Sequence, residues 1–350
     1  MHDLKARLKR HARDLGFDLV GIAAATEADT FAALSDWLSH DYAGEMAYMH
    51  RHAEARRHPA SILPEVRCVI MVGMNYHVES ANSPSDNKSG KVARYALGED
   101  YHHVLRKRLK ELLAWLQEQA PGCWGRAVVD TAPLLERDFA RRAGLGWFGK
   151  NTMLLDKKLG SYFFLGGLLV DIELDPDTAH ETSHCGTCTA CLDACPTQAF
   201  VGPGMLDARR CLSYLNIELR GPVAEDLRPF LDEWLFGCDI CQEVCPWNRK
   251  APLAAESAFS PRPDLLALDL VEVLSLSEEE FKKRFRGTAL LRAGRSGLLR
   301  TAAMILGNRR DISGLPALER VSNDPDPIVS DACQWAIRQI REGSTPSESG

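Results

Sequence analysis

The sequence predicts an α+β fold with a mixed helix and strand body, a module organised by cysteines, and a helical C-terminal region. Three observations predict it. Apolar residues recur at both helical and strand spacing early in the chain, eight cysteines gather from residue 185 to residue 245, and two helical patterns follow them. The 350 residues, 45% of them hydrophobic, can bury a sizeable core. We expect regions at 1–178, 179–250 and 251–342, and a disordered tail at 343–350.

The N-terminal body begins with an amphipathic pattern. Residues 3–22 carry leucines at helical spacing and end in FDLVGIA, which predicts a helix followed by a strand. The run CVIMVGMNY at 68–76 predicts a second strand, and the polar segment at 79–90 predicts a surface loop. Leucines on one side of 101–118 predict an amphipathic helix. A body of this kind is α/β or α+β.

The remaining elements lie on both sides of the cysteines. The block 126–175 predicts a strand and turn, a helix closed by Gly144, and a strand pair or one long strand. Residues 296–308 and 328–341 predict two helices, the layout of a single HEAT-like repeat. One repeat cannot bury its own apolar face, so we expect it to pack on the main body.

Charge and hydropathy restrict the function classes. The formal net charge of −6 argues against a protein that coats nucleic acid with its whole surface, although a local basic face remains possible. The chain shows no secretion signal and no run of 18 apolar residues. We therefore expect a soluble cytoplasmic protein, a monomer without a membrane partner, whose cysteines bind metal rather than form disulfides.

The cysteine spacing predicts two 4Fe–4S clusters. The run C-x2-C-x2-C-x3-C-P from Cys185 to Pro196 matches that of two-cluster bacterial ferredoxins, in which the fourth cysteine ligates the other cluster. A second run, from Cys238 to Pro246, lacks one ligand, which the isolated Cys211 can supply. The predicted ligands are Cys185, Cys188, Cys191 and Cys245 for cluster one, and Cys195, Cys211, Cys238 and Cys241 for cluster two.

Tetrahedral zinc is the alternative for these cysteines, but it rarely uses a triple CxxCxxC run that ends in Cys-Pro. The other three cysteines, Cys68, Cys123 and Cys333, lie in apolar or helical contexts and are expected to be buried and inert.

A second site is predicted upstream of the cysteines. Asp130 ends a strand and precedes a Thr-Ala-Pro turn, where a carboxylate can point into a cleft as a proton donor. Residue type and place alone favour an N-cap for the following helix. The segment GLGWFGKN at 144–151 offers glycines for close backbone approach, but its spacing does not match a nucleotide-binding fingerprint.

Taken together, these motifs resemble the epoxyqueuosine reductase family, cobalamin- and iron–sulfur-dependent enzymes that perform the last step of queuosine synthesis on tRNA. The resemblance rests on both cysteine runs and on the segments 44–59, 94–105, 129–151, 160–166 and 285–308. It implies a cobalamin-binding body of the reductive dehalogenase type. It also implies that Asp130 protonates the departing oxygen, which would require a carboxyl whose pKa burial has raised.

The resemblance further implies dispersed cobalamin contacts. Residues carried over from the family as cobalamin contacts are Arg57, Tyr95, Asp130, Lys150, Asn151, Ser161 and Asp239. For Tyr95 and Ser161, ordinary core or turn structure is an equal alternative. His50 is not expected to ligate the cobalt, because a cobalt without a strong lower ligand is easier to reduce.

A basic run predicts where tRNA binds. Residues 282–310 contain nine lysines and arginines and no acidic residue, a pattern suited to the phosphates of an anticodon stem-loop. A solvated helix face is the alternative. Thr301 stands where the family usually has Asn. The predicted tRNA contacts are Lys282, Lys283, Arg284, Arg292, Arg295 and Arg300.

Three other functions fit parts of the pattern: a ferredoxin-type electron-transfer protein, a reductive dehalogenase-like reductase, and an RNA-binding protein with structural clusters. The reductase hypothesis itself requires an external one-electron donor of the flavodoxin or ferredoxin type.

Overall fold

The computed structural model describes residues 2–79 and 88–344. Most of the predicted loop at 79–90 and of the predicted tail at 343–350 lies outside the described residues. Among the described residues, no helix combines the length and the apolar character needed to cross a membrane.

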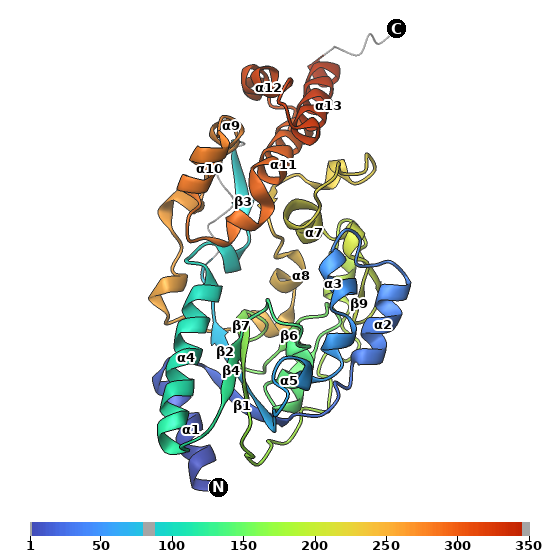
Figure 1. Cartoon of the computed structure of the whole chain (residues 1–350). Coiled ribbons are helices and arrows are strands. Elements are labelled where there is room, and N and C mark those ends of the chain that lie inside the picture. The colour runs from blue at the N-terminus through green and yellow to red at the C-terminus, as the bar shows by residue number, and fades with distance from the viewer. Residues whose placement is uncertain (1, 80–87, 345–350) are drawn as a thin grey trace.

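A four-stranded antiparallel sheet forms the centre of the N-terminal body (Figure 1). Its order is β1-β2-β7-β4, and every neighbouring pair is antiparallel, which makes the body α+β. The strands are β1 (Leu19–Ala24), β2 (Cys68–Asn75), β4 (Gly125–Val128) and β7 (Phe163–Val170). The strands at 19–24 and 68–75 confirm two predictions, and β7 shows that the last apolar block forms one long strand.

Helices cover both faces of this sheet because β2 is apolar on both sides. Ile70 packs with leucines of α1 (His2–Asp14) and α4 (Tyr101–Gln119), whereas Val69 packs with Phe139 of α5 (Glu136–Arg142). Both predicted helices, at the N-terminus and at 101–118, are confirmed. As predicted, Gly144 follows the end of α5 in the left-handed region, with φ of 79°.

Two further helices, α2 (Phe31–Ser39) and α3 (Ala47–Arg51), lie in the chain between β1 and β2. The GLGWFGKN segment forms a small hairpin of β5 (Trp147–Phe148) and β6 (Leu154–Leu155). A Cβ on Gly146 would lie 2.0 Å from the carbonyl oxygen of Leu155. Close backbone approach therefore requires glycine at this position.

The cysteine module contains only short elements. They are α6 (Ala190–Asp193), β8 (Phe200–Gly202), β9 (Met205–Leu206), α7 (Leu212–Ile217), β10 (Trp234–Phe236) and α8 (Ile240–Glu243). The α6 and α8 helices, each carrying one cysteine of a CxxC pair, pack against one another. A second sheet joins β10 to β3 (Ser89–Val92) and β3 to β11 (Leu268–Asp269). This sheet ties the body, the module and the C-terminal region together.

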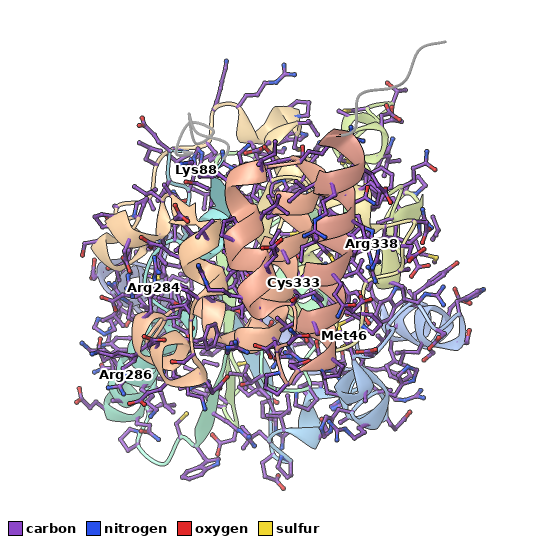
Figure 2. The ribbon with its side chains drawn as sticks, turned by 90° about the horizontal axis from the view of Figure 1, so that it is seen from above. Met46, Lys88, Arg284, Arg286, Cys333 and Arg338 are labelled. Atoms are coloured by element: carbon purple, nitrogen blue, oxygen red, sulfur yellow. The ribbon has the colours of Figure 1, made fainter. Side chains whose placement is uncertain are left out.

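The C-terminal region is helical, as predicted. Its helices are α9 (Leu270–Leu274), α10 (Glu278–Arg284), α11 (Gly294–Asn308), α12 (Leu315–Val321) and α13 (Pro327–Ser344). The stretch between the two predicted helices, at 309–327, carried no helix prediction but contains α12, because Ala317 and Leu318 pack into the core. Figure 2 looks onto these helices, with Arg284 and Arg286 on one side and Arg338 on the other. Helix α11 contacts α7 and β10 of the cysteine module, and its buried residues share a core cluster with Val92 and Ala96 of the N-terminal body, which confirms that the repeat packs on the rest of the protein.

Candidate active site and cysteine groups

Asp130 lies just beyond β4 in a strained backbone conformation. Its φ of 53° falls in the left-handed region, which non-glycine residues adopt mainly where the surroundings hold them there. Its backbone N–H donates to Glu136 Oε1 at 2.7 Å. The side chain is 61% exposed and does not cap α5, whose N-cap residue is Leu135. The N-cap interpretation of Asp130 is therefore wrong, and the carboxylate is open to a substrate.

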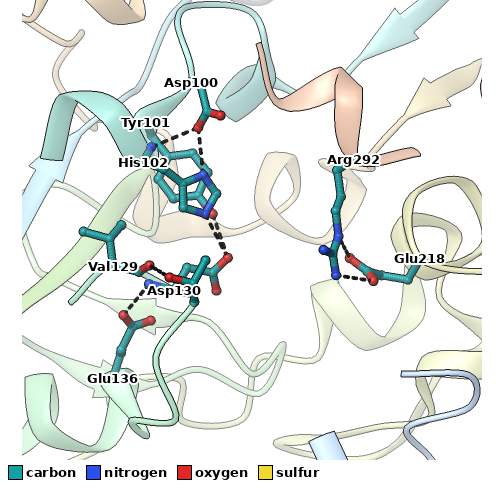
Figure 3. A network of polar contacts seen from close by, with 9 residues as sticks. Asp100, Tyr101, His102, Val129, Asp130, Glu136, Glu218 and Arg292 are labelled. Carbon is teal, nitrogen blue, oxygen red and sulfur yellow. Dashed lines mark hydrogen bonds and ion pairs between the residues drawn. The ribbon is translucent and has the colours of Figure 1, made fainter. Parts of the chain in front are cut away.

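His102 bridges two carboxylates at this site, as Figure 3 shows. Its Nδ1 lies 2.7 Å from Asp100 Oδ1, and its Nε2 lies 3.3 Å from Asp130 Oδ2. Tyr101 donates its hydroxyl to the same Asp130 oxygen at 3.1 Å. Desolvation disfavours the imidazolium, but the two carboxylates outweigh it and raise the pKa of His102 to about 9. His102 is therefore protonated at neutral pH.

Sequence reasoning missed the role of His102. The available signal was the Asp-x-His spacing at the start of α4, where Asp100 caps the helix by accepting the backbone N–H of His102 at 3.0 Å. The position of Asp130 opposite His102 depends on the fold.

The expected raised pKa of Asp130 is wrong. The hydrogen bond from His102 is the largest influence and, with the charge of that imidazolium, lowers the pKa of Asp130 against the opposing effect of desolvation. The neighbouring Glu136 behaves in the opposite way, since desolvation and the charge of Asp130 raise its pKa to about 8. Protons near Asp130 are thus held by His102 and Glu136.

Arg292 and Glu218 face Asp130 from the opposite side of the site (Figure 3). Two hydrogen bonds, of 2.9 and 2.8 Å, join the guanidinium to the carboxylate. The Arg292 guanidinium also lies 5.6 Å from the ring centre of Tyr48. Desolvation raises the pKa of Tyr48, and the charges of Glu218 and then of Asp130 act in the same direction. The body and the C-terminal region therefore both contribute to this site.

Arg57 pairs with acidic residues at the surface, and its expected cofactor contact stays a prediction. Its guanidinium bonds Glu54 at 2.6 Å and lies over Phe31, on the exposed surface. Arg56, the preceding residue, lies within electrostatic reach of Asp130 instead. The one-residue difference arises because the chain turns as a 3-10 helix at Glu54–Arg56, where neighbouring side chains point in different directions.

The first cysteine group surrounds a cavity of about 230 Å³. This volume exceeds the roughly 10–15 Å³ that one water molecule requires on the same measure, so the cavity has room for a group of several atoms. Among the described residues, no group of three or more His, Cys, Asp or Glu side chains is placed to hold a metal ion. The cysteines that line the cavity are Cys185, Cys188, Cys191 and Cys245.

Lys150 and Asn151 hold the two cysteine loops. The Lys150 ammonium donates to the carbonyl oxygens of Gly186 at 2.8 Å and Cys188 at 2.9 Å. The Asn151 amide donates to the carbonyl oxygen of Cys241 at 3.3 Å. Both were expected to contact cobalamin, but their side-chain donors bind the backbone of the cysteine loops.

The second cysteine group consists of half-buried thiols that lie close to one another. Burial is the largest influence on three of its thiols and raises their pKa, and the group members raise one another's values further. Cys241 is also influenced by Cys191, so the two groups are neighbours. Thiols of this kind ionise when a metal replaces their protons. The members are Cys195, Cys211, Cys238 and Cys241.

Asp239 and Tyr95 lie between the second group and Asp130. Asp239 is 2% exposed and accepts the backbone N–H of Arg94 at 2.8 Å and its guanidinium at 3.1 Å. Burial raises its pKa to about 6. Tyr95 lies within electrostatic reach of both Asp239 and Asp130. This tyrosine therefore connects the cysteine module to the site.

Ser161 is enclosed in a polar network, which corrects its expected cofactor contact. Its side chain is buried, and its hydroxyl accepts the amides of Gln242 and Asn248, each at 3.0 Å. The Asn248 oxygen in turn accepts the Ser161 backbone N–H at 2.7 Å. A network satisfied in this way stabilises the junction of β7 with the module.

The predicted tRNA contacts divide into surface and interior residues. Arg300 is 1% exposed and donates to the carbonyl oxygens of Leu215, Leu219 at 3.0 Å and Gly221 at 2.7 Å. Arg295 is mostly buried against Asp324. Neither side chain is placed for phosphate contact, which corrects both expectations. Thr301 is also buried, so its departure from the family pattern lies inside α11.

The other predicted contacts remain at the surface, although several have acidic partners from other segments. Lys282 pairs with Glu278 at 2.9 Å, and Arg284 pairs with Glu272 at 3.3 Å. Lys283 is exposed. The basic run is therefore less continuous in space than in the sequence.

Two groups of four cysteines beside a strained aspartate and a charged histidine define a redox enzyme with an electron-transfer module. A family model described as epoxyqueuosine reductase QueG, DUF1730, matches residues 56–131, and one described as a 4Fe-4S double cluster binding domain matches residues 184–248. The second match confirms the predicted two-cluster module.

An epoxyqueuosine reductase of Pseudomonas aeruginosa is 45% identical over 98% of this chain and 95% of its own length. The chain belongs to the epoxyqueuosine reductase family and is an oxidoreductase.

Solved structures give the same result. An epoxyqueuosine reductase with an epoxyqueuosine-modified tRNA-Tyr stem-loop has a TM-score of 0.90 and 32% identity, covering 97% of this chain and 90% of its own. The Bacillus subtilis enzyme, with its catalytic aspartate loop swung out of the active site, has a TM-score of 0.89 and 30% identity over 97% and 91% of the two chains.

Proposed function

We propose that this protein reduces epoxyqueuosine to queuosine in the anticodon loop of a tRNA, with Asp130 delivering a proton to the departing oxygen. The observation that carries this proposal is the strained, exposed Asp130 held against a protonated His102. An oxygen that leaves carbon needs a proton donor within hydrogen-bond reach, and Asp130 and His102 together provide one.

The reaction requires electrons and protons in equal number. Converting an epoxide to an alkene releases the oxygen as water and consumes two electrons and two protons. When bound, the two clusters would supply electrons singly and cobalamin would supply the carbon–oxygen chemistry. The residues of the chain must hold the modified nucleobase, exclude water and move the protons.

The proton path we propose runs through His102. The protonated imidazole passes its Nε2 proton to Asp130 Oδ2, and Asp130 passes a proton to the leaving oxygen. Asp100, 2.7 Å from the other imidazole nitrogen, stabilises the charged histidine between turnovers. Glu136, with a pKa of about 8, can hold a second proton beside the loop.

The electron path we propose uses the two cysteine groups in sequence. Cluster one would be held by the group that lines the open cavity, and cluster two by the second group, whose neighbour Asp239 lies within electrostatic reach of Tyr95. The donor set supports this assignment, because four thiolates are the usual ligands of a 4Fe–4S cluster.

The surroundings of Asp130 also suit cobalamin. Tyr48, Tyr95 and Tyr101 all lie within electrostatic reach of Asp130, and aromatic faces match the flat apolar surface of a corrin ring. We propose Tyr95 and Asp130 as the residues of this chain that would contact it, with Lys150, Asn151 and Asp239 supporting the adjoining loops.

Substrate binding and electron supply complete the proposal. Lys282, Lys283, Arg284 and Arg292 would contact the phosphates of the stem-loop, and the exposed Arg286 joins them. The electron donor would be a flavodoxin or ferredoxin, and the enzyme would act as a cytoplasmic monomer.

Asp130→Asn tests the proposed function. Protein reconstituted with iron, sulfide and cobalamin is incubated with a reductant and an epoxyqueuosine-containing stem-loop, and nucleosides are analysed by mass spectrometry. The wild-type product should lose the mass of one oxygen, and the variant should be slower by about 100-fold or more. Undiminished turnover by the variant with cobalamin still bound would contradict the proposed role of Asp130 as proton donor. A wild-type protein without corrinoid absorbance would instead indicate a plain electron-transfer protein.

A further inference from the structure

We infer that the open edge of the first cysteine group is the docking surface for a small acidic one-electron carrier protein, steered by Lys157, Lys158, Arg249 and Lys250. We call these four residues the basic rim. The inference rests on the proposed function in one respect, since it requires a cluster in the first group. It adds the place where electrons enter and the kind of partner that delivers them.

The first cysteine group is close to solvent. Gly186 and Thr187, inside its first CxxC, are both exposed. Pro246 is exposed and Trp247 is half-buried, and both line the same cavity as the four thiols. A surface with apolar residues at its centre and a redox group close to solvent suits the small, transient interfaces of electron-transfer partners.

The basic rim borders this opening from two segments that the fold brings together. Lys157 and Lys158 lie in a turn closed by a β-bridge between Asp156 and Gly160. Gly160 packs against the second segment so closely that a Cβ would lie 2.0 Å from Asn248 Oδ1 and 3.0 Å from the carbonyl oxygen of Trp247. Arg249 and Lys250 follow directly. Two pairs of cations therefore emerge side by side next to Trp247.

The charge of the rim is not neutralised within the part of the chain that the structure describes. All four side chains are exposed, and the ion pairs formed among the described residues involve other lysines and arginines. Asp156 is the nearest acidic residue in the sequence, but its Oδ1 accepts the backbone N–H groups of Lys158 and Leu159. In a chain with a net charge of −6, four clustered cations produce a local positive field that attracts an acidic partner.

An acidic protein fits this surface better than RNA does. Tyr95 and Asp239 connect Asp130 to the second cysteine group, whereas the rim adjoins the first. A carrier that docks at the rim donates one electron to the outer cluster and is itself oxidised by one electron. Two such encounters supply the pair consumed for each epoxide. A stem-loop engaged at Asp130 would gain nothing from cations at the outer cluster.

The test uses the holoenzyme and a reduced acidic flavodoxin as the probe. Stopped-flow absorbance gives the second-order rate of cluster reduction for wild type, for Lys157→Glu/Lys250→Glu and for the milder Lys157→Gln/Lys250→Gln. Lys107→Glu/Lys110→Glu, on an exposed face of α4, is the control with an equal change of charge. At low ionic strength we expect the rim charge reversal to slow the reaction at least 10-fold and the glutamine variant to slow it less. This difference between the rim variants and wild type should vanish in high salt. At low ionic strength, the rim variants should also have a higher dissociation constant for oxidised flavodoxin than wild type.

Several results would overturn the inference. Equal losses in the rim and control variants would show that only net charge matters. Weaker stem-loop binding with unchanged reduction by flavodoxin would assign the rim to RNA. Iron and sulfide content and the rate of reduction by dithionite should match wild type, and a loss of either in the glutamine variant would assign the rim to cluster assembly. If docking fails while dithionite still supports epoxide reduction, the proposed function survives without the docking surface.

Discussion

Asp130 shows how a single residue can be held in a strained backbone conformation. A left-handed backbone at an aspartate costs free energy that the surroundings must supply, and the bond from its N–H to Glu136 is one such contribution. Glu136 therefore acts as a positioning residue for the loop.

Replacing Glu136 separates its hydrogen bond from its charge. Glu136→Gln keeps a carbonyl oxygen that can accept the Asp130 N–H, whereas Glu136→Ala removes the acceptor. We expect the alanine variant to lose about 100-fold in single-turnover rate, because the loop is misplaced, and the glutamine variant to retain most of it. Equal losses in both variants would show that the carboxyl proton, rather than loop position, is what the reaction needs.

The pKa of His102 makes stability depend on pH. Its folded-state pKa of about 9 lies above the ordinary value of 6.5, so its contribution is fully present below about pH 6.5 and is lost as the pH rises through 9. The contribution is on the order of 3 kcal/mol. Chemical denaturation of wild type and His102→Asn between pH 6 and pH 10 should give curves that converge at high pH. Curves that stay parallel would contradict the ion pairs with Asp100 and Asp130.

At the scale of elements, the hairpin that follows α5 serves the cysteine loops. Its connecting residues place Lys150 against the first loop and Asn151 against the second, so one short turn fixes both. The glycine at position 146 allows the two strands of the hairpin to approach closely. The motif that resembled a nucleotide loop is therefore a clamp on the module.

Lys150→Met should weaken this clamp selectively. Losing two hydrogen bonds from a charged donor frees the loop of the first cysteine group, and we expect iron content to fall from about eight atoms per chain toward four. Iron analysis and electron paramagnetic resonance of the reduced protein measure the loss. Lys110→Met, an exposed lysine on α4, is the matched control and should keep its full iron content. Equal occupancy in both variants would refute the clamp.

At the scale of the whole molecule, distant segments build each functional surface. The β10-β3-β11 sheet joins residues near 90, 235 and 268, and the Asp130 site collects Arg292 from the C-terminal region. Acidic residues from elsewhere, such as Glu272, neutralise part of the basic run. The RNA-binding surface that we propose is therefore a subset of the residues that the run contains.

Substitutions of buried and exposed basic residues in the run at 282–310 should have different effects on stability and on stem-loop binding. Arg300→Met removes the donor of three carbonyl oxygens, one of them in a buried hydrogen bond, so we expect a loss of about 3 kcal/mol in the free energy of unfolding. Lys283→Met/Arg286→Met should leave stability unchanged within about 0.5 kcal/mol and weaken stem-loop binding. Each lost phosphate contact should also reduce the slope of log affinity against log salt by roughly 0.7 to 0.9. Denaturation and salt-dependent binding measure both effects, and a stable, binding-deficient Arg300→Met would reverse this assignment.

Local patterns were sufficient for much of the fold. The helix at 101–119 and the strands at 19–24 and 68–75 follow from apolar periodicity, because burial of one face acts within a few residues. Helix α12 was missed because its seven residues carry too little periodic signal. The spacing of the cysteines alone predicted the double-cluster module, since ligands on short loops must reach the same cluster.

By itself, the sequence determined the class of fold, the cysteine module, the family and the prominence of Asp130. Only the tertiary structure decided which polar atoms are already bonded within the protein. Arg300 and Ser161 are buried, and Lys150 and Asn151 bind the cysteine loops. The structure also decided that Arg56 lies within electrostatic reach of Asp130. It also placed His102 against Asp130, which lowers the pKa that the sequence led us to expect raised. Hydrogen bonds and desolvation depend on neighbours far apart in the chain, and no local pattern encodes them.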